Sequence, residues 1–386
     1  MHERLLNDDL KLFRDTFRDW LKREVTPQYE TWERNGLCPR EIYRKAGEQG
    51  FLLLDQPGAF GGLDLDFRFS AVLIEEIALA GANGLALWLH SDIIAPYIGH
   101  FGSDAQKKFW LPKMASGEAI AAIAMSEPGT GSDLQAMQMT AVRDGDDWVL
   151  NGTKTFISNG INSDVVIVAA KTANAANASA NAKYTPLTLF IVEKSRTGLT
   201  VGRKLEKLGL KAQDTAELFF SDCRIPHTNV LGEVGQGFLY LTKSLARERL
   251  CMAIHSLAAA RFALSITLDY IDSRHAFGKK ISAFQNTRFK LADIATEIEV
   301  TQAFLDQCVL DLNDGRDLTM NAAIAKLKAT EVLGRVTDDC LQLFGGWGYM
   351  SEYPISHAYA DARVWRIFGG TSEIMREIIA RKVIES

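Results

Sequence analysis

Apolar residues in the first part of the chain recur at helical spacing. They fall three or four positions apart, which predicts a helix with one buried stripe. The residues of this stripe are Leu6, Leu10, Phe13, Phe17, Trp20 and Leu21. Further helices are predicted over 40–49, after Pro39 and before Gly50, over 69–80 and near 106–115. Residues 1–120 are therefore expected to form an all-helical domain.

The pattern changes to short β-rich runs between Thr140 and Pro226. The expected strands cover residues 140–144, 147–157, 164–172, 187–194, 199–204 and 216–226. Residues 144–147 read DGDD, a composition typical of a hairpin turn between the first two strands. The Ala/Asn-rich stretch over 172–186 is low in complexity, and we interpret it as an exposed strand connection without a catalytic role. Residues 121–235 are expected to form a central β domain.

A helical period returns at Phe238 and continues through Ile271. Further helices are predicted over about 284–313, over 319–343, and from Ser372 to the end of the sequence. Long helices joined by short connections are typical of an antiparallel bundle. The order along the chain is α, β, α. We therefore predict an α+β multidomain fold with domains at 1–120, 121–235 and 236–386.

Composition and charge narrow the class of protein. Of the 386 residues, 47% are hydrophobic and 24% are charged, an ordinary globular balance. The formal charge of −5 argues against a nucleic-acid or anionic-membrane surface, although a local Arg/Lys cluster can still bind phosphates. No run of about eighteen apolar residues occurs, so no membrane span is expected. The charged, amphipathic first residues fit neither a signal nor a transit peptide, and we expect a cytoplasmic protein of bacterial type.

Several catalytic motifs are missing from the sequence. The five cysteines are scattered without a CxxC pair, which predicts free thiols. The seven histidines form no HxxH or HExxH group, so no metal site is expected. Residues 232–237 read GEVGQG, which is neither GxGxxG nor the start of a βαβ unit. GxxxxGK[ST] and GxSxG do not occur, so P-loop and serine-hydrolase functions have no support.

Two segments of the β region have the composition of a ligand-binding loop. Residues 123–133 read IAMSEPGTGSD, whose glycines and hydroxyls suit a polar planar ring or a phosphate, although an ordinary Gly/Ser-rich turn fits as well. Residues 154–160 place Phe156 beside Ser158 at the end of a predicted strand. This phenylalanine either flanks a flavin ring or packs inside the β domain.

Two further candidate segments lie near the end of the chain and read GGWGY (345–349) and RIFGGTSE (366–373). Gly345 either caps the preceding helix or opens a binding site. Thr371 or Ser372 either caps the last helix or places its N-terminus beside an anion or a carbonyl oxygen. The residues alone leave both interpretations open.

Glu248 lies on an otherwise apolar face of a predicted helix that is buried nearly all round. Steps of three and four along the helix reach Leu241, Leu245, Met252, His255 and Ala259. The flanking Arg247 and Arg249 point to other sides. A buried carboxylate is costly unless it is paired or has a chemical task. Glu248 is therefore either a catalytic carboxylate or half of a buried ion pair with Arg249 or a basic residue of a neighbouring helix.

Taken together, these segments make the chain resemble the acyl-CoA dehydrogenase family over essentially its whole length. MSEPGTGSD (125–133) resembles the family's T-E-P-G-A-G-S-D loop, and RHAFGKKISAFQ (274–285) resembles its R-x-A-F-G…Q segment. QLFGGWGYMSEYP (342–354) and DARVWRIFGGTSEIMREII (361–379) resemble its C-terminal signature. The resemblance implies an N-terminal helical domain, a central β-barrel and a C-terminal four-helix bundle. It also implies a homotetramer built as a dimer of dimers.

The resemblance implies FAD as the cofactor. Arg274 and Gln285, from a neighbouring subunit, would hold its adenine-diphosphate part together with residues 342–346. Residues 371–373 would lie near the phosphates, where a helix N-terminus suits an anion. The expected FAD contacts are Ile123, Ala124, Met125, Ser126, Glu127, Pro128, Gly129, Thr130, Gly131, Ser132, Phe156, Ile157, Ser158, Arg274, Gln285, Gln342, Leu343, Phe344, Gly345, Gly346, Thr371, Ser372 and Glu373.

The resemblance implies the position of the catalytic base in two ways: one glutamate is missing from the last loop, and another is present on the first bundle helix. Many members carry a glutamate in a Y-E-G-T string of the last loop, which reads FGGT here, at residues 368–371. A smaller branch, including the long-chain and isovaleryl enzymes, carries its base in an E-R-L string on the first bundle helix. Counting back twenty-eight residues from Ala276 reaches Glu248, followed by Arg249 and Leu250. The HSD string at 90–92 and KAQDTAELFF at 211–220 look most like the long-chain type.

The implied reaction is oxidation of an acyl-CoA thioester to the trans-2-enoyl-CoA, as in fatty acid β-oxidation. Glu248 would remove the α-proton, with its pKa raised by apolar surroundings. A backbone N–H near residues 369–370 and the flavin ribityl hydroxyl would polarise the thioester carbonyl. The β-hydride would pass to flavin N5 and the electrons to electron-transferring flavoprotein. The expected substrate contacts are Ser132, Leu239, Arg247, Arg249, Gly369 and Gly370.

Two alternatives and the acyl group stay open. One alternative is a flavin oxidase of the same fold that uses oxygen. The other is a non-catalytic acyl-CoA-binding member, against which the presence of Glu248 argues. Medium-chain, long-chain and branched acyl groups are all compatible with the sequence. The small residues at positions 81, 82, 84 and 86 either leave room for an acyl tail or pack helices closely.

Overall fold

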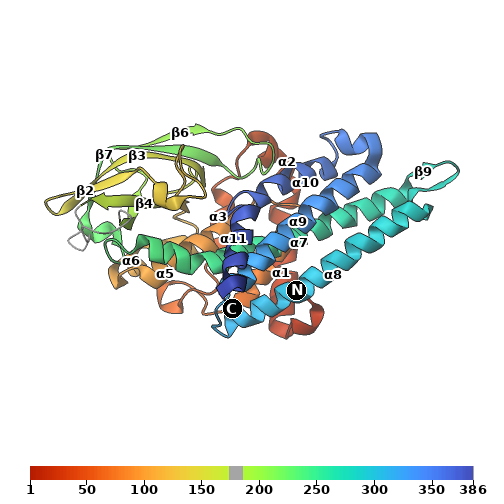
Figure 1. The fold of residues 1–386 in the computed structure, drawn as a ribbon, viewed down its shortest axis with the longest axis horizontal. Coiled ribbons are helices and arrows are strands. Elements are labelled where there is room, and N and C mark those ends of the chain that lie inside the picture. The colour runs from red at the N-terminus through yellow and green to blue at the C-terminus, as the bar shows by residue number, and fades with distance from the viewer. Residues whose placement is uncertain (174–185, 386) are drawn as a thin grey trace.

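The computed structural model describes residues 1–173 and 186–385. Figure 1 shows the strands gathered at one end of an elongated molecule and long helices at the other, with further helices between and beneath them. The order along the chain is helices, strands, helices, as predicted. Most of the predicted strand connection over 172–186, namely residues 174–185, lies outside the described residues.

The N-terminal part is helical. Its helices are α1 (Asp8–Glu24), α2 (Thr26–Asn35), α3 (Glu41–Glu48), α4 (Phe67–Leu79), α5 (Ala95–Phe101) and α6 (Asp104–Ala115), with a π-helical segment, η3 (Leu89–Ile94), directly before α5. The four predicted helices are confirmed, whereas α2, η3 and α5 were not predicted. Only Trp32 and Glu33 are buried in α2, so its apolar period is weak. Residues 85–98 are buried almost throughout and show no amphipathic contrast.

The central part is an eight-stranded sheet with the strand order β6-β7-β3-β2-β4-β5-β8 and with β1 paired parallel to β4. Its strands are β1 (Ala121–Ala124), β2 (Thr140–Asp144), β3 (Asp147–Ser158), β4 (Val165–Ala173), β5 (Leu187–Glu193), β6 (Leu199–Lys204), β7 (Thr215–Pro226) and β8 (Val230–Leu231). The predicted strands agree within a residue or two, and the pairing of Asp144 with Asp147 confirms the hairpin turn. The short strands β1 and β8 were missed because they offer too few positions for an alternating pattern.

The C-terminal part consists of long helices packed around α9. These helices are α7 (Gly237–Ser273), α8 (Gln285–Asn313), α9 (Thr319–Phe344), α10 (Pro354–Ala362) and α11 (Ser372–Glu385). A hairpin of β9 (His275–Ala276) and β10 (Lys279–Lys280) projects from the far end of the bundle (Figure 1). Only α10 was not predicted. Helix α7 is long and apolar enough to cross a membrane, but 72% of its most apolar window is buried inside the protein, as expected for a central bundle helix.

The two helical parts share one apolar core. Ile77 of α4, Leu257 of α7 and Leu305 of α8 belong to the same buried cluster. The sheet encloses a second core around Trp148 and Phe190. Helix α7 thus runs between the N-terminal helices and the rest of the bundle, so a polar side chain on its buried face is shielded from water on several sides.

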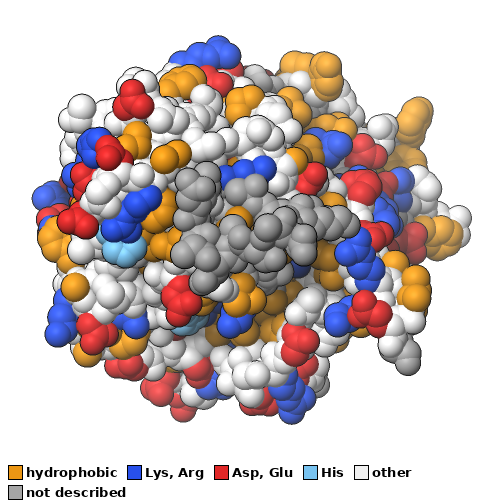
Figure 2. All heavy atoms as spheres, turned by 60° about the vertical axis from the view of Figure 1, so that its left-hand side comes forward, with side chains coloured by type: hydrophobic (Ala, Val, Ile, Leu, Met, Phe, Trp, Pro, Cys, Tyr) orange, Lys and Arg blue, Asp and Glu red, His pale blue; other side chains and the backbone are white. Residues whose placement is uncertain are grey.

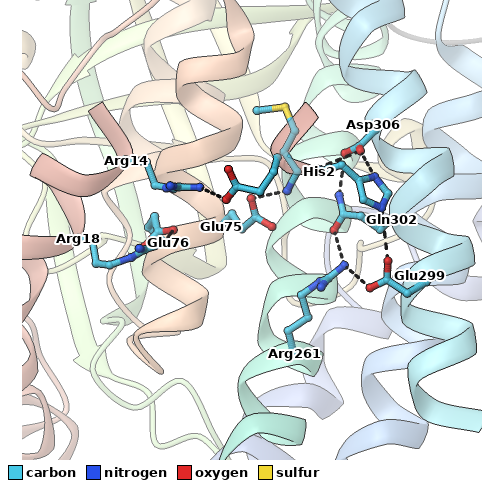
Figure 3. Close-up of polar contacts among 11 residues, drawn as sticks. His2, Arg14, Arg18, Glu75, Glu76, Arg261, Glu299, Gln302 and Asp306 are labelled. Carbon is cyan, nitrogen blue, oxygen red and sulfur yellow. Dashed lines mark hydrogen bonds and ion pairs between the residues drawn. The ribbon is translucent and has the colours of Figure 1, made fainter. Parts of the chain in front are cut away.

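Polar contacts at the edge of this core tie the N-terminal helices to the bundle (Figure 3). Arg18 of α1 makes two hydrogen bonds of 2.8 Å to Glu76 of α4. Across the interface, the ring of His2 contacts Asp306 of α8 and lies 3.4 Å from Glu299. These contacts hold α1 against α4 and the first residues of the chain against α8. At the sheet end, basic and acidic side chains are interspersed over the visible face (Figure 2), in keeping with the small net charge.

Candidate active site

Glu248 lies in the middle of α7 and is only 3% exposed. The face of α7 predicted to be apolar is confirmed, because Leu241, Met252 and His255 are all buried. The hydroxyl of Tyr97, from α5, donates a hydrogen bond of 2.7 Å to Oε1 of Glu248. In the part of the chain that the structure describes, no cationic group lies within ion-pair distance of this carboxylate. A structural ion pair therefore does not explain why Glu248 is buried.

The protein environment raises the pKa of Glu248 to about 7. The largest cause is burial, which disfavours the charged carboxylate. The hydrogen bond from Tyr97 and the positive charge of Arg249 act in the opposite direction. A carboxylate whose pKa is near neutrality is suited to accept a proton at physiological pH.

The loop of residues 369–370 rests on α7 one turn beyond Glu248. Gly369 has a φ of +63°, and a Cβ at this position would lie 2.2 Å from the sulfur of Met252. Any side chain at 369 would be strained and would displace Met252. Within residues 1–173 and 186–385, the Gly369 amide makes no backbone hydrogen bond. The structure thus brings the predicted base and the predicted carbonyl-binding loop together.

Two buried cations lie against this loop. Lys326 of α9 is fully buried and donates a hydrogen bond of 2.6 Å to the Gly370 carbonyl. Burial lowers the pKa of Lys326 to about 8. Arg249 is 6% exposed, and its Nη2 lies 3.8 Å from the point that a Cβ on Gly370 would occupy. Burial lowers the pKa of Arg249, and its Nε has no hydrogen-bond partner among the described residues. Arg249 therefore faces the loop with unused donor capacity.

Arg247 has its polar contacts within the protein. It forms ion pairs with Asp55 and with Asp92 of η3, the latter at 2.9 Å, and donates a further hydrogen bond of 3.1 Å to the Asp92 carbonyl. Its guanidinium also lies 4.8 Å from the ring centroid of Phe67. These contacts hold η3 against α7, and the substrate contact expected of Arg247 stays a prediction.

The segment expected to bind the flavin follows β1 and is held by a buried ion pair. Lys154 of β3 is fully buried and donates to the Met125 carbonyl (3.0 Å) and to Glu127 (2.9 Å). Glu127 also accepts hydrogen bonds from the backbone N–H groups of Gln138 and Met139, at 2.6 and 3.0 Å. The Glu127 carboxylate therefore shapes the loop from inside, so FAD would contact this residue through its backbone.

Phe156 does not pack inside the sheet. Its φ is +59°, its side chain is 70% exposed, and the pairing of β3 with β7 shifts register between Lys154 and Ile157. Of the two interpretations, packing inside the β domain is therefore excluded, and the bulge turns the ring outward. The N–H of Thr155 donates a hydrogen bond of 3.0 Å to the Ser126 carbonyl. This contact places the exposed ring of Phe156 beside the flavin loop. A non-glycine residue in this backbone conformation is frequent at ligand sites.

A cavity of about 640 Å³ lies beside the hairpin at the end of α7. Its lining includes Arg274 and all five residues expected at 342–346, whereas Gln285 is exposed outside it. Gly345 ends α9 with a φ of +61°, so it is both a helix cap and part of the cavity wall. A Cβ on Gly345 or Gly346 would meet nothing within 4 Å, so the wall is open for a ligand.

The last helix begins where an anion site was expected. The hydroxyl of Thr371 accepts a hydrogen bond from Ile374 N–H (3.3 Å), so the capping interpretation is confirmed. Ser372 is 2% exposed, and its hydroxyl has no partner within the described residues. Glu373 is exposed. Two expected substrate contacts, Ser132 and Leu239, are also exposed, on the flavin loop and on the first turn of α7.

These observations fit FAD. Open glycines line the cavity at 345–346 and the loop at 129–131, an exposed aromatic ring stands beside that loop, and a buried hydroxyl at 372 lacks a partner. Sequence reasoning missed Tyr97, Lys154 and Lys326. All three are polar residues in otherwise apolar or strand-like surroundings, and only the tertiary fold gives them their partners. Within the HSD string at 90–92, Asp92 forms an ion pair with Arg247.

Models of three protein-family domains match this chain in order. They are described as the acyl-CoA dehydrogenase N-terminal domain (residues 7–118), middle domain (residues 122–223) and C-terminal domain (residues 235–384). Together they cover nearly the whole sequence.

Individual proteins are similar over nearly the whole of this chain. The long-chain specific acyl-CoA dehydrogenase of Sus scrofa mitochondria is 46% identical over 99% of this chain and 88% of its own. The crystal structure of acyl-CoA dehydrogenase from Geobacillus kaustophilus matches with a TM-score of 0.95 at 44% identity, covering 98% of this chain and 99% of that one. An acyl-CoA dehydrogenase from Bacillus anthracis solved with FAD matches with a TM-score of 0.91 at 30% identity, covering 100% of this chain and 69% of that one.

Proposed function

The chain belongs to the acyl-CoA dehydrogenase family and is an FAD-dependent enzyme of that family, and we propose that it oxidises long-chain acyl-CoA thioesters with Glu248 as the base. The observation that carries this proposal is the buried Glu248, which has no ion-pair partner among the described residues and whose pKa is raised to about 7, next to a final loop that has a glycine at 369. Position 369 is a glycine and offers no carboxylate, which supports a base on α7.

In this mechanism the Glu248 carboxylate removes the proton from the α-carbon of the thioester. The Gly369 and Gly370 amides face the carbonyl oxygen, and Arg249 adds positive charge beside them, so that the charge developing on this oxygen is stabilised. FAD, when bound, supplies the two-electron oxidant that accepts the hydride from the β-carbon. The product is the trans-2-enoyl-CoA. Burial keeps water away from Glu248 and leaves the substrate as the source of its proton.

The residues that would hold FAD fall into two groups. The loop at 125–132, shaped by the Lys154–Glu127 pair, and the exposed Phe156 would hold the flavin ring. The cavity containing Arg274 and residues 342–346 would hold the adenine-diphosphate part, together with Gln285 from a second subunit and the α11 N-terminus. The cavity residues lie at the open end of the bundle, which supports a shared site in a homotetramer.

The long-chain assignment rests on the relatives and not on small residues near α4. Gly81 and Gly84 are closely packed, because a Cβ would lie 2.7 Å from the ring of Phe262 at the first and 2.9 Å from the backbone of Gln213 at the second. Ala82 and Ala86 are buried as well. These four positions pack the helices and provide no empty space for a tail. The 46% identity to a long-chain specific enzyme supports the substrate class.

A panel of acyl-CoA thioesters tests the proposal. Purified holoenzyme is mixed anaerobically with straight-chain substrates of increasing length and with branched ones, and bleaching of the flavin absorbance is followed. The proposal predicts the highest kcat/KM for long straight chains. A clear preference for short or branched chains would contradict the substrate class, and no bleaching by any acyl-CoA would contradict the reaction.

The electron acceptor is proposed to be electron-transferring flavoprotein, as is usual in the family. Peroxide release under air is compared with reduction of electron-transferring flavoprotein or of a dye after the same turnover. Peroxide in amounts equal to the product would identify an oxidase instead.

A further inference from the structure

The segment formed by η3 and α5 connects the flavin loop to the helix that carries the base. Nδ1 of His90, in η3, accepts a hydrogen bond from the Ala121 N–H (3.2 Å), and Nε2 of the same ring donates one to the Met114 carbonyl (3.0 Å). Burial lowers the pKa of His90 to about 4, so the ring stays neutral and keeps these two contacts. Two residues later, Asp92 pairs with Arg247, the residue directly before Glu248. The segment is therefore fixed to β1 on one side and to α7 on the other.

A π-helical turn sets the orientation of α5. Residues 89–94 adopt this rare conformation, which occurs frequently at functional sites and shifts the following helix relative to an uninterrupted one. Helix α5 continues from it with Pro96 in its first turn. Tyr97 follows directly and is fully buried. Its ring position is thus defined by backbone geometry and by the contacts of His90 and Asp92.

Tyr97 and Glu248 are joined by a hydrogen bond of ordinary length, and the side chain of Ser244 is a second hydrogen-bond partner of Tyr97. The Tyr97 hydroxyl lies 2.7 Å from Oε1, whereas Oε2 has no hydrogen-bond partner among the described residues. Burial and the neighbouring Glu248 raise the pKa of Tyr97 well above its usual value, so the phenol remains a donor at any working pH. Arg249 of α7 also acts on Glu248 and lowers its pKa. Glu248 in turn raises the pKa of Cys251 on the same helix, and Arg249 lowers the pKa of Lys326 on α9.

We propose that Tyr97 is a positioning residue for α-proton transfer. Its hydroxyl fixes one oxygen of Glu248, leaves the other oxygen free to face the substrate, and favours the ionised form of the carboxylate. The inference rests on the proposed function, because it requires Glu248 to be the base. No part of the sequence signature includes position 97, and the assignment comes from the geometry of α5 against α7.

The direction of the effect follows from the hydrogen bond. A donor to a carboxylate stabilises the charged form and holds the pKa below the value that burial alone would give. Without the Tyr97 hydroxyl, the pKa of Glu248 rises and less of the base is ionised at neutral pH. The loss of rate is then largest at low pH and shrinks as the pH rises above the new pKa.

The test is the pH dependence of flavin reduction in Tyr97→Phe, measured anaerobically in a stopped-flow instrument as kcat/KM for one long-chain acyl-CoA. We expect the midpoint of the profile to rise by about one pH unit, with a rate about tenfold lower at low pH than in the unaltered enzyme and a smaller loss at high pH. Tyr43→Phe is the matched control. Tyr43 is equally buried, and its hydroxyl donates to Asn159 (3.2 Å), away from Glu248, so its midpoint is expected to stay in place.

Replacement of Tyr97 by 3-fluorotyrosine provides a second measurement with the opposite sign. The fluorinated phenol is a stronger donor, so the midpoint should fall. An unchanged midpoint in both Tyr97 variants would overturn the inference. Glu248→Gln separates it from the proposed function: if this variant reduces flavin normally, Glu248 is not the base, whereas an inactive Glu248→Gln with an unshifted Tyr97→Phe removes only the role of Tyr97.

Discussion

At the scale of single residues, the site depends on carboxylates and cations that are buried for different reasons. Glu248 has one phenol and no cation within ion-pair distance in the described part of the chain, and its pKa is raised to about 7. Glu127 is buried too, but it accepts hydrogen bonds from Lys154 and from two backbone amides. The surroundings of Glu248 leave its carboxylate able to take up a proton, whereas the hydrogen bonds of Glu127 fix the flavin loop.

The raised pKa of Glu248 gives a pH prediction. Glu248 must be ionised to accept a proton, and its ionised fraction falls about tenfold for each pH unit below its pKa. With a pKa of about 7, kcat/KM for the acyl-CoA should rise with pH up to about 7 and level off above it. The measurement is the rate of flavin reduction against pH at low substrate concentration. A profile that is flat through the acidic range would show that no group with this pKa controls the reaction.

At the scale of elements, β3 and the loop after β1 form one unit. The bulge in β3 turns Phe156 outward, and Lys154, two residues before it, reaches the carbonyl of Met125 and the carboxylate of Glu127 in the loop. The flavin loop thus takes its shape from a strand that is distant in sequence. Breaking the ion pair should therefore loosen the cofactor site before it affects the base.

Lys154→Met tests this unit. The substitution leaves Glu127 buried without its cation, which typically costs about 3–5 kcal/mol when one partner of a buried pair is removed. We expect a lower Tm and a smaller fraction of protein purified with FAD. Both are measured by thermal unfolding with and without added FAD. Lys171→Met is the control, because Lys171 lies on β4 of the same sheet and forms no ion pair among the described residues. Equal Tm and FAD content in the two variants would contradict this role of Lys154.

The order of elements could be predicted from the sequence, because it depends on local periodicity. The apolar face around Glu248 left two interpretations open, a catalytic carboxylate and a buried ion pair, and the resemblance to the family selected the first. The periodicity of apolar residues gives no prediction where a segment is buried on all sides. Residues 85–98 are buried almost throughout and have no polar face, so η3, α5 and hence Tyr97 were missed. Periodicity also could not predict the ion pairs of Arg247, because its partners Asp55 and Asp92 come from remote segments. Phe156 was left undecided, since a backbone bulge has no signature in the side-chain pattern.

At the scale of the whole molecule, the end of the bundle exposes apolar side chains beside the proposed adenine-diphosphate site. Phe277 at the tip of the β9–β10 hairpin is 96% exposed, and Tyr349 beyond α9 is 83% exposed. The hairpin projects away from the body of the molecule (Figure 1). Large exposed apolar groups on a projecting element are typical of a surface covered by another subunit. Such an arrangement agrees with the homotetramer proposed for this chain.

Phe277→Asp tests the assembly. A charge at the hairpin tip would be buried without a partner in a subunit interface, which disfavours association. We expect the unaltered protein to show a mass near four times 42.7 kDa by light scattering, and Phe277→Asp to show a smaller mass and weaker FAD retention. Leu12→Asp, on α1 and 69% exposed, should leave the mass unchanged. A full-size assembly that persists in Phe277→Asp at low protein concentration would argue against this interface.

The central claim is that Glu248 removes the α-proton. Its most direct test is the rate of anaerobic flavin reduction by a saturating long-chain acyl-CoA in Glu248→Gln, which keeps the shape of the side chain and removes its capacity to take up the proton. We expect a yellow protein with normal FAD content whose flavin is reduced at least about a thousandfold more slowly than in the unaltered enzyme. Reduction within about tenfold of the normal rate would contradict it, because general-base catalysis contributes more than that.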